Sequence, residues 1–441
     1  MIVDEPSMKV ISAALGMYDI MENKVTMVEG LEKKRAPFPD MGAIYILSPT
    51  KESIEKLLDD YSSKSKVLYG RNVFVYFLGS IPEQYIKLIK KSRQLLKRLK
   101  ALSEINVNFL VKESRAYVCD IGQPFSGYYL RNVGTPPEAI LAEKLVTVCA
   151  TLNEYPYIRY KQSSGICNSL AGIFKVKMDE FVYANPEWWY HGSGNSGRKS
   201  SERDRSTILL LDRANDLLTP LMHDFRYQSM IRDLLPMEGD KITTEVETEE
   251  GHDSKDVLLN EKDKLWVELR GKHIAEVIEV LSSRIRDTVK SNATAALGRG
   301  GEVTLQDLAS AVKELPEYRE ILAKLSQHMY IARQCMDKFR RENLLELSEI
   351  EQTIATGIDD EGDSVSFSQA RSRVEGSLLR MRDVEERLRM LMIATISQNG
   401  LKSSDKDKLL NAAELGRGER MTLENLSKLG ISSRSSKKNR S

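Results

Sequence analysis

The chain has 441 residues, which is too long for one compact core and indicates two or three domains. Its 65 basic and 64 acidic residues nearly balance, so the overall charge gives no support to nucleic acid as a partner. No apolar run approaches the roughly 20 residues of a membrane span, and no secretory signal is recognisable at the start. We therefore expect an intracellular protein that meets membranes only peripherally, with four reduced cysteines.

Strand and helix signals alternate in the first third of the chain. Apolar runs predict strands at residues 2–4, 43–47, 73–78 and 105–111, and helices are expected at 51–60 and 83–102. Strands that alternate with helices of this length favour a parallel sheet covered on both faces.

The middle of the chain contains a helix signal at 141–152, an extended piece at 155–160 and a Gly/Ser-rich segment at 191–206. That segment includes a GxGxxG sequence formed by Gly192, Gly194 and Gly197. A phosphate-binding loop of this kind needs a strand before it and a helix after it. Neither is indicated here, so we interpret the segment as a flexible linker.

Residues 207–235 are the most informative stretch of the sequence. An apolar strand, Ile208 to Leu211, runs directly into Asp212, and a polar turn and a helix-like segment follow. An unbroken apolar strand that ends in an acid is typical of a buried parallel strand with its polar tip at the carboxyl edge of a sheet. This pattern suits an enzyme and a binding scaffold equally.

Beyond Pro236 the pattern becomes mainly helical. Residues 243–255 are expected to form an acidic polar loop, and apolar residues in steps of three and four predict a helix over 305–341 that breaks at Pro316. A second helix is expected at 378–396, ended by Asn399 and Gly400, and the tail 431–441 is basic and expected to be disordered.

Catalytic and metal-binding patterns are weak. The five histidines show no ligand-like spacing and no nucleotide-binding loop is present, so no cofactor or metal is expected. Asp212 and Asp216 can be posed as a carboxylate pair, although Asp212 can equally pair with a cation or cap backbone amides. An α/β hydrolase or nucleotide-dependent enzyme with Asp212 as catalytic acid therefore remains the alternative function.

Residues 84–100 form a basic segment with an apolar face. Seven cations alternate with leucines and isoleucines there. The segment suits a membrane surface or an acidic peptide, and it also suits a helix that packs on the sheet with its lysines in water.

The order of residues over 207–235 closely resembles the signature of the Sec/Munc (SM) family of syntaxin-binding proteins. Four further stretches match the family in the same order, at residues 33–54, 103–110, 150–160 and 256–277. The last of these, DVLLNEKDKLWVELRGKHIAEV, is highly specific. The similarity extends over essentially the whole chain.

The resemblance implies an α/β plus all-α chain with an arch-shaped, three-domain SM fold. Parallel sheets are expected in domains 1 and 2, and domain 3 is expected to be mainly helical. The implied ranges are 1–106 for domain 1, 107–235 for the first part of domain 2, 236–430 for domain 3 and 431–441 for the tail. Because the family pattern continues beyond both ends of the match, the chain is expected to be truncated and domain 2 incomplete.

The function implied is regulation of membrane fusion and not catalysis. A cytoplasmic monomer of this family is expected to bind a syntaxin-type SNARE or an assembled SNARE bundle, without nucleic acid, and to promote vesicle docking and exocytosis. Membrane contact is expected only through the partner, at the plasma membrane or secretory vesicles. A folded fragment that has lost SNARE binding is a further possibility.

The resemblance also implies two binding sites. The SNARE cavity is expected to use Asp19, Glu29, Lys33, Lys34 and Arg35. A pocket for the N-terminal peptide of the SNARE is expected at Ile86, Leu99, Leu102 and Glu104.

Overall fold

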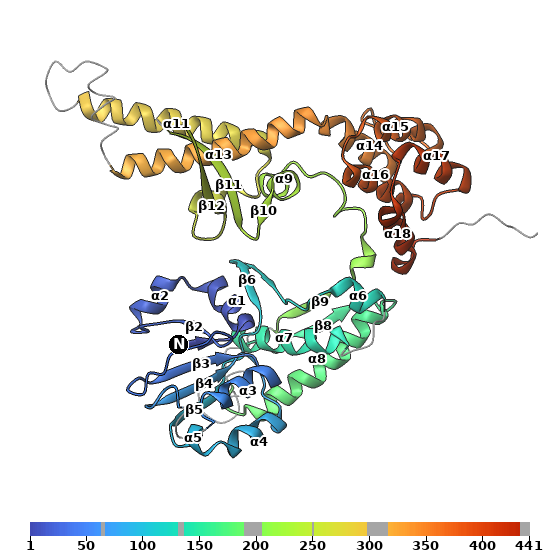
Figure 1. The fold of residues 1–441 in the computed structure, drawn as a ribbon. Coiled ribbons are helices and arrows are strands. Elements are labelled where there is room, and N and C mark those ends of the chain that lie inside the picture. The colour runs from blue at the N-terminus through green and yellow to red at the C-terminus, as the bar shows by residue number, and fades with distance from the viewer. Residues whose placement is uncertain (63–66, 131–135, 189–204, 249–250, 298–315, 433–441) are drawn as a thin grey trace, which may run out of the picture. The chain divides into compact units, whose positions relative to one another are not determined.

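The computed structural model in Figure 1 describes residues 1–62, 67–130, 136–188, 205–248, 251–297 and 316–432. The chain divides into two compact units, Met1–Asp212 and Arg213–Ser441, each with cores of its own. The first unit is α/β and the second is mainly helical, so the predicted combination of fold classes is confirmed. All four cysteines are free thiols, as predicted.

The first unit is built on a five-stranded sheet in the order β2-β1-β3-β4-β5. Every neighbouring pair in this sheet is parallel, as predicted. The strands are β1 (Ile2–Val3), β2 (Glu29–Gly30), β3 (Ala43–Leu47), β4 (Val73–Phe77) and β5 (Leu99–Glu104). The connecting helices are α1 (Glu5–Ala14), α2 (Met17–Glu22), α3 (Lys51–Asp59), α4 (Glu83–Lys91) and α5 (Arg93–Leu96).

Along β3 and β4, one face of this sheet is buried and the other is half-buried. Buried and half-buried residues alternate along β3 and β4, because side chains of a strand point to opposite faces in turn. The buried face packs against Ile54 of α3, Ile89 of α4 and Leu95 of α5. Thr50 caps α3 by accepting a hydrogen bond from the Ser53 amide, which explains why that helix begins where the sequence predicts.

The sequence prediction was wrong between residues 97 and 111. A helix as far as Leu102 and a strand over Ile105–Val111 were expected, whereas α5 ends at Leu96 and β5 spans Leu99–Glu104. Backbone pairing with β4 overrides the helical spacing of the leucines. The strand ends because Asn106 adopts a left-handed conformation, with φ of 52°.

The remainder of the first unit is a helix pair with two small sheets. Its elements are the hairpin β6 (Leu110–Glu113) and β7 (Ala116–Val118), α6 (Pro124–Tyr129), α7 (Pro137–Leu152), α8 (Gly165–Ala184) and the parallel pair β8 (Tyr157–Tyr160) and β9 (Thr207–Leu210). The prediction of a buried strand at 208–211 was wrong in part. Within the described residues β9 pairs only with β8, and Leu209 and Leu211 are 61% and 74% exposed.

The second unit begins with α9 (Tyr227–Leu234) and a three-stranded antiparallel sheet. The sheet comprises β10 (Met237–Glu238), β11 (Lys241–Thr248) and β12 (Gly251–Leu258). The acidic loop predicted at 243–255 was therefore wrong: these residues belong to the β11–β12 hairpin, whose long register pairs Thr243 with Asp256. Cross-strand pairing stabilises polar strands that lack an apolar run.

Helices make up the rest of the second unit. They are α10 (Lys264–Leu269), α11 (Ile274–Leu297), α13 (Pro316–Arg341), α14 (Leu344–Thr356), α15 (Phe367–Arg380), α16 (Val384–Ser397), α17 (Ser403–Ala413) and α18 (Arg417–Asn425). Helices α11 and α13 lie side by side (Figure 1). The single helix predicted at 378–396 was wrong: Asp383 accepts from the Glu385 amide and starts α16 after a break from α15.

Three predictions fall partly or wholly outside the described residues. They concern the GxGxxG segment, the part of the 305–341 helix before Pro316, and all but the first two residues of the basic tail. In the ranges that are described, no helix is both long and apolar enough to cross a membrane.

Candidate functional site

Arg35 is held inside the first unit by a buried carboxylate. Its Nη1 and Nη2 atoms donate to the Oδ2 and Oδ1 atoms of Asp60 at 2.7 and 2.9 Å, and the two side chains are 4% and 7% exposed. The hydroxyl of Tyr45 also donates to Asp60 at 2.7 Å. Burial raises the pKa of Tyr45, so this hydroxyl stays protonated. The structure thus gives Arg35 a structural contact that sequence reasoning missed.

Lys33 and Lys34 differ from Arg35 because both are exposed. They follow Leu31, a buried residue whose amide donates to the Val3 carbonyl at 2.7 Å. The loop is therefore anchored at Leu31 and at Arg35, and the two lysines project between these anchors.

The two predicted acidic residues of the cavity have partners within the first unit. Asp19 lies on α2, where its carboxylate accepts from the Gly16 amide at 2.7 Å. Glu29 lies on β2 and accepts from the Tyr69 hydroxyl at 3.1 Å. Both contacts orient the carboxylates, and Asp19 remains exposed to solvent.

Helix α2 and the residue before it carry an unusual exposed apolar surface. Leu15, Met17, Tyr18 and Met21 are 49%, 52%, 76% and 55% exposed. Only Ile20 of this short helix is buried. Several large apolar side chains exposed together on one short segment are a feature of interaction surfaces.

Three of the predicted N-peptide residues lie on the edge strand β5, and the fourth, Ile86, lies on α4. The register between β4 and β5 shifts by one residue after Leu99. Before the shift, Leu99 pairs with Val73. After it, Leu102 pairs with Val75 and Glu104 pairs with Phe77. Paired residues share a face, so the shift places Leu99, Leu102 and Glu104 on one side of the sheet. Ile89 of α4 packs on that side, and Ile86 lies one turn earlier on the same helix face.

Glu104 joins the end of β5 to the segment that leads into α4. Its Oε1 atom accepts from the Ile81 amide at 2.8 Å and from the Ser80 hydroxyl at 3.3 Å. Leu102 is 36% exposed, whereas Leu99 packs partly on the core. The exposed part of this group therefore lies toward the first turn of α4.

A buried polar cluster in the second unit was not predicted. Glu351 of α14 accepts from the His223 amide at 3.0 Å and from its ring Nδ1 at 2.8 Å, and both side chains are 2% exposed. The ring Nε2 lies 2.8 Å from Nη1 of Arg389 and 3.6 Å from Glu386. Arg389 also pairs with Asp233 of α9.

The neighbouring carboxylate shifts the pKa of His223 upward. Burial alone lowers the pKa of His223, but the hydrogen bond and charge of Glu351 outweigh burial and raise it. Since Arg389 can only donate, Nε2 of His223 accepts from it and Nδ1 donates to Glu351, and three carboxylates share this guanidinium and ring. The cluster joins the segment before α9 to α14 and α16.

A second buried network connects two sequence stretches that match the family. The Nε2 atom of His328 contacts Asp263 at 3.0 Å, and its Nδ1 atom contacts the Tyr227 hydroxyl at 3.1 Å. Tyr227 belongs to the 207–235 stretch and Asp263 to the 256–277 stretch, and Asp263 also caps α10. The sequence analysis did not predict this role; aspartate is a residue type that favours the N-cap position of a helix.

Asp212, the residue proposed as catalytic acid in the alternative function, accepts hydrogen bonds from two hydroxyl groups. Its Oδ1 atom accepts from the Tyr129 hydroxyl at 2.6 Å, and its Oδ2 atom accepts from the Ser164 hydroxyl at 2.7 Å. Ser164 in turn caps α8. Asp212 therefore ties the end of β9 to α6 and α8, and the part of the chain that the structure describes contains no metal-binding group of three His, Cys, Asp or Glu residues.

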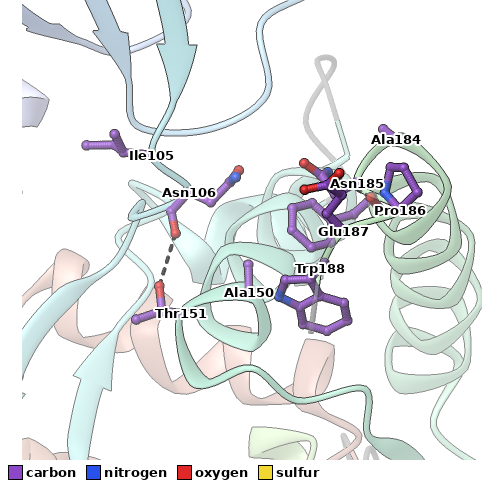
Figure 2. Close-up of a pocket in the computed structure, with 10 residues that line it drawn as sticks. Ile105, Asn106, Ala150, Thr151, Ala184, Asn185, Pro186, Glu187 and Trp188 are labelled. Carbon is purple, nitrogen blue, oxygen red and sulfur yellow. Dashed lines mark hydrogen bonds between the residues drawn. The ribbon is translucent and has the colours of Figure 1, made fainter. Parts of the chain in front are cut away.

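A separate cavity of about 420 Å³ lies between the linker after β5 and the carboxyl ends of α7 and α8 (Figure 2). The Thr151 hydroxyl donates to the Asn106 carbonyl at 3.1 Å on one wall, and Trp188 lies on the opposite side. None of the residues predicted for the two sites lines this cavity.

Comparison with known families decides what kind of protein carries these surfaces. The model of the Sec1 family matches residues 1–441. The chain belongs to the Sec1 family. The predicted resemblance is thereby confirmed.

Among its Sec1-family relatives, the chain is 34% identical over 435 residues to the protein transport protein sec1 of Dictyostelium discoideum. It is 31% identical over 440 residues to the SNARE-interacting protein KEULE of Arabidopsis thaliana. Each match covers 98% of this chain, but only 70% of the first relative and 65% of the second. The chain thus spans about two thirds of the length of these relatives.

Solved structures show the same fold. The Unc18–syntaxin 1 complex from Monosiga brevicollis matches with a TM-score of 0.83 and 26% identity, covering all of this chain and 76% of that one. Vps45 in complex with the Qa SNARE Tlg2 matches with a TM-score of 0.75 and 19% identity, covering 97% and 72%. The second likeness concerns the fold alone.

Proposed function

We propose that this Sec1-family protein binds a syntaxin-type SNARE, alone or in an assembling SNARE bundle, and thereby promotes vesicle docking and membrane fusion in exocytosis. The observation that carries the proposal is the family match over all 441 residues. A relative named for SNARE interaction and a similar structure solved with syntaxin 1 support the choice of partner. The proposed protein is a regulator without catalytic activity, and the two hydrogen bonds to Asp212 support that choice.

The proposed cavity surface combines charge with apolar area. Lys33 and Lys34 supply exposed cations, and α2 supplies exposed Met17, Tyr18 and Met21 with Asp19 between them. A helical partner with an apolar stripe and flanking charges needs both kinds of group. Arg35 acts indirectly in this proposal, because its bond to Asp60 fixes the loop that carries the lysines.

The proposed N-peptide pocket is the group Ile86, Leu99, Leu102 and Glu104. Leu102 and Ile86 offer apolar contact, and Glu104 adds a carboxylate beside them. The same proposal includes three domains, with boundaries at residues 106, 235 and 430. It also includes a monomeric protein located peripherally at the plasma membrane or secretory vesicles.

Calorimetric titration of the 441-residue chain with a syntaxin-type cytosolic domain tests this function. The expected dissociation constant is about micromolar or tighter. Replacing Lys33 and Lys34 with alanine should weaken binding roughly fivefold to thirtyfold, at about 0.5–1 kcal/mol for each exposed charge.

The matched control replaces Lys402 and Lys408, two exposed lysines of the second unit, and should leave the affinity unchanged. Equal affinity of the Lys33/Lys34 variant and the wild type would remove the cavity assignment. Absence of binding by a cooperatively folded chain would overturn the proposed function.

A further inference from the structure

One region of the first unit concentrates positive charge that the proposed function does not use. Residues 84–103 contain seven lysines and arginines and no acidic residue, whereas the whole chain has a net charge of +1. These residues form α4, α5 and most of β5.

Two of the seven cations are occupied by other contacts. Lys87 pairs with Glu83 one turn earlier at 2.9 Å. Arg98 turns inward, where its Nε and Nη1 atoms donate to the carbonyls of Gly70 and Gln94 at 3.2 and 2.8 Å. Neither is therefore available to a partner as a bare exposed charge.

Four of the remaining cations lie at the corner where α4 ends and α5 begins, and we call them the basic patch: Lys90, Lys91, Arg93 and Lys97. All four are exposed, and no acidic residue in the described ranges lies within ion-pair distance of them. Leu96 lies among them and is 42% exposed.

Helix stabilisation accounts for only part of this arrangement. Lys90 and Lys91 occupy the last turn of α4, where cations interact favourably with the helix dipole. Arg93 begins the four-residue helix α5, which is too short to explain a cation there, and the exposed part of Leu96 contributes nothing to the core. A partner that takes up both the charge and the apolar side chain explains the whole group.

We propose that the basic patch binds the surface of a membrane that contains anionic phospholipids. Unpaired lysines beside an exposed leucine match such a surface: the ammonium groups attract phosphate and carboxylate head groups, and the leucine enters the boundary with the acyl chains. Three of the four cations are lysines, which act as point charges and suit a diffuse anionic surface, whereas bidentate recognition of a single carboxylate favours arginine.

Lys90 and Lys91 of the basic patch are separated along α4 from Glu104 of the proposed N-peptide pocket. Glu104 bonds to Ile81 ahead of the first turn of that helix, whereas the patch begins at its last turn. Nine helical residues span about 13 Å. Replacement of Lys90 and Lys91 therefore tests membrane contact apart from Glu104, whereas Lys97 lies two residues from Leu99 of the pocket.

Vesicle co-sedimentation of the full chain tests the proposal. The probes are phosphatidylcholine vesicles with and without phosphatidylserine, at low and high salt. We expect binding only to the phosphatidylserine vesicles, reversed by high salt because counterions screen exposed charge. Each cation near an anionic surface contributes about fivefold to binding, so replacing all four patch cations with glutamine should abolish sedimentation.

The matched control replaces four exposed cations of the second unit with glutamine: Lys402, Lys408, Arg417 and Lys428. It should sediment like the wild type, and Leu96→Ser should weaken binding severalfold without changing the salt dependence.

Equal sedimentation with neutral vesicles, or full binding by the patch variant, would overturn the proposal. Loss of SNARE affinity by the patch variant with vesicle binding intact would assign the patch to a protein partner instead. If that variant fails to fold, the milder variant that replaces only Lys90 and Lys91 with glutamine decides: its sedimentation should fall about tenfold or more, and unchanged sedimentation would overturn the proposal.

Discussion

His223 contacts charged side chains from two different helices of the second unit. One carboxylate, Glu351, receives both its backbone amide and its ring nitrogen, while Arg389 and Glu386 face the other ring nitrogen. These groups come from α14 and α16, so the histidine holds separate helices together. His223, although it lies in a loop, is buried and links α14 to α16.

The raised pKa of His223 makes its contribution depend on pH. A group whose pKa is raised by folding stabilises fully below its ordinary value and loses that effect as the pH rises through the raised value. His223→Gln should therefore lower the free energy of unfolding more at about pH 6 than at about pH 8, on either side of the ordinary histidine value. The loss should be about 3 kcal/mol near neutrality, as for a broken buried pair.

Urea unfolding at the two pH values measures this difference. The control is His273→Gln: His273 is exposed and its ring accepts only from the Ala275 amide among the described residues, so its replacement should cost less than that of His223. A larger cost of His223→Gln at the higher pH would contradict the assignment.

At the scale of elements, the loop after β2 is defined by its contacts with α3. Arg35 pairs with Asp60, the residue that ends α3, and Glu32 pairs with Lys56 of the same helix. Two ion pairs thus join one loop to one helix, one of them buried. The exposed lysines between them depend on this anchoring for their position.

Arg35→Ala should destabilise the first unit by about 3–5 kcal/mol, because it leaves the buried Asp60 carboxylate without its cation. Lys34→Ala should change stability by less than about 0.5 kcal/mol, as expected for an exposed residue. Chemical denaturation of the two variants measures both effects. Comparable losses for Arg35 and Lys34 would show that the buried pair does not hold the loop.

The elements that the sequence predicted well have local causes. Strand β3 and helix α3 begin where alternating apolar residues and the cap at Thr50 place them. The failures depend on partners distant in the chain: β5 forms because β4 has a free edge, and β11 and β12 form because they pair with each other. Local periodicity contains no information on such pairing.

The candidate sites show the same division. Lys33 and Lys34 are exposed and Leu102 and Glu104 share a face of the sheet, while the two sites that the resemblance implied stay predictions. The burial of Arg35 and the networks around His223 and His328 could not be predicted, because each requires a partner from another element.

For the molecule as a whole, the most informative stretch of the sequence contributes to both units. Its strand β9 ends the first unit at Asp212, and its helix α9 packs in the core of the second. The residues alone left an enzyme and a binding scaffold equally open. Membership of the Sec1 family favours the binding scaffold, and so do the hydrogen bonds that the Asp212 carboxylate accepts from Tyr129 and Ser164.

Hydrogen–deuterium exchange of the full chain, with and without a syntaxin-type cytosolic domain, tests the central claim most directly. The account predicts slower exchange on binding in residues 15–35, which include α2 and the lysine loop, and in residues 81–104 when the SNARE carries its N-terminal peptide. The hairpin β6–β7 region and α17 serve as internal references. Unchanged exchange in both predicted segments, despite complex formation, would contradict the account.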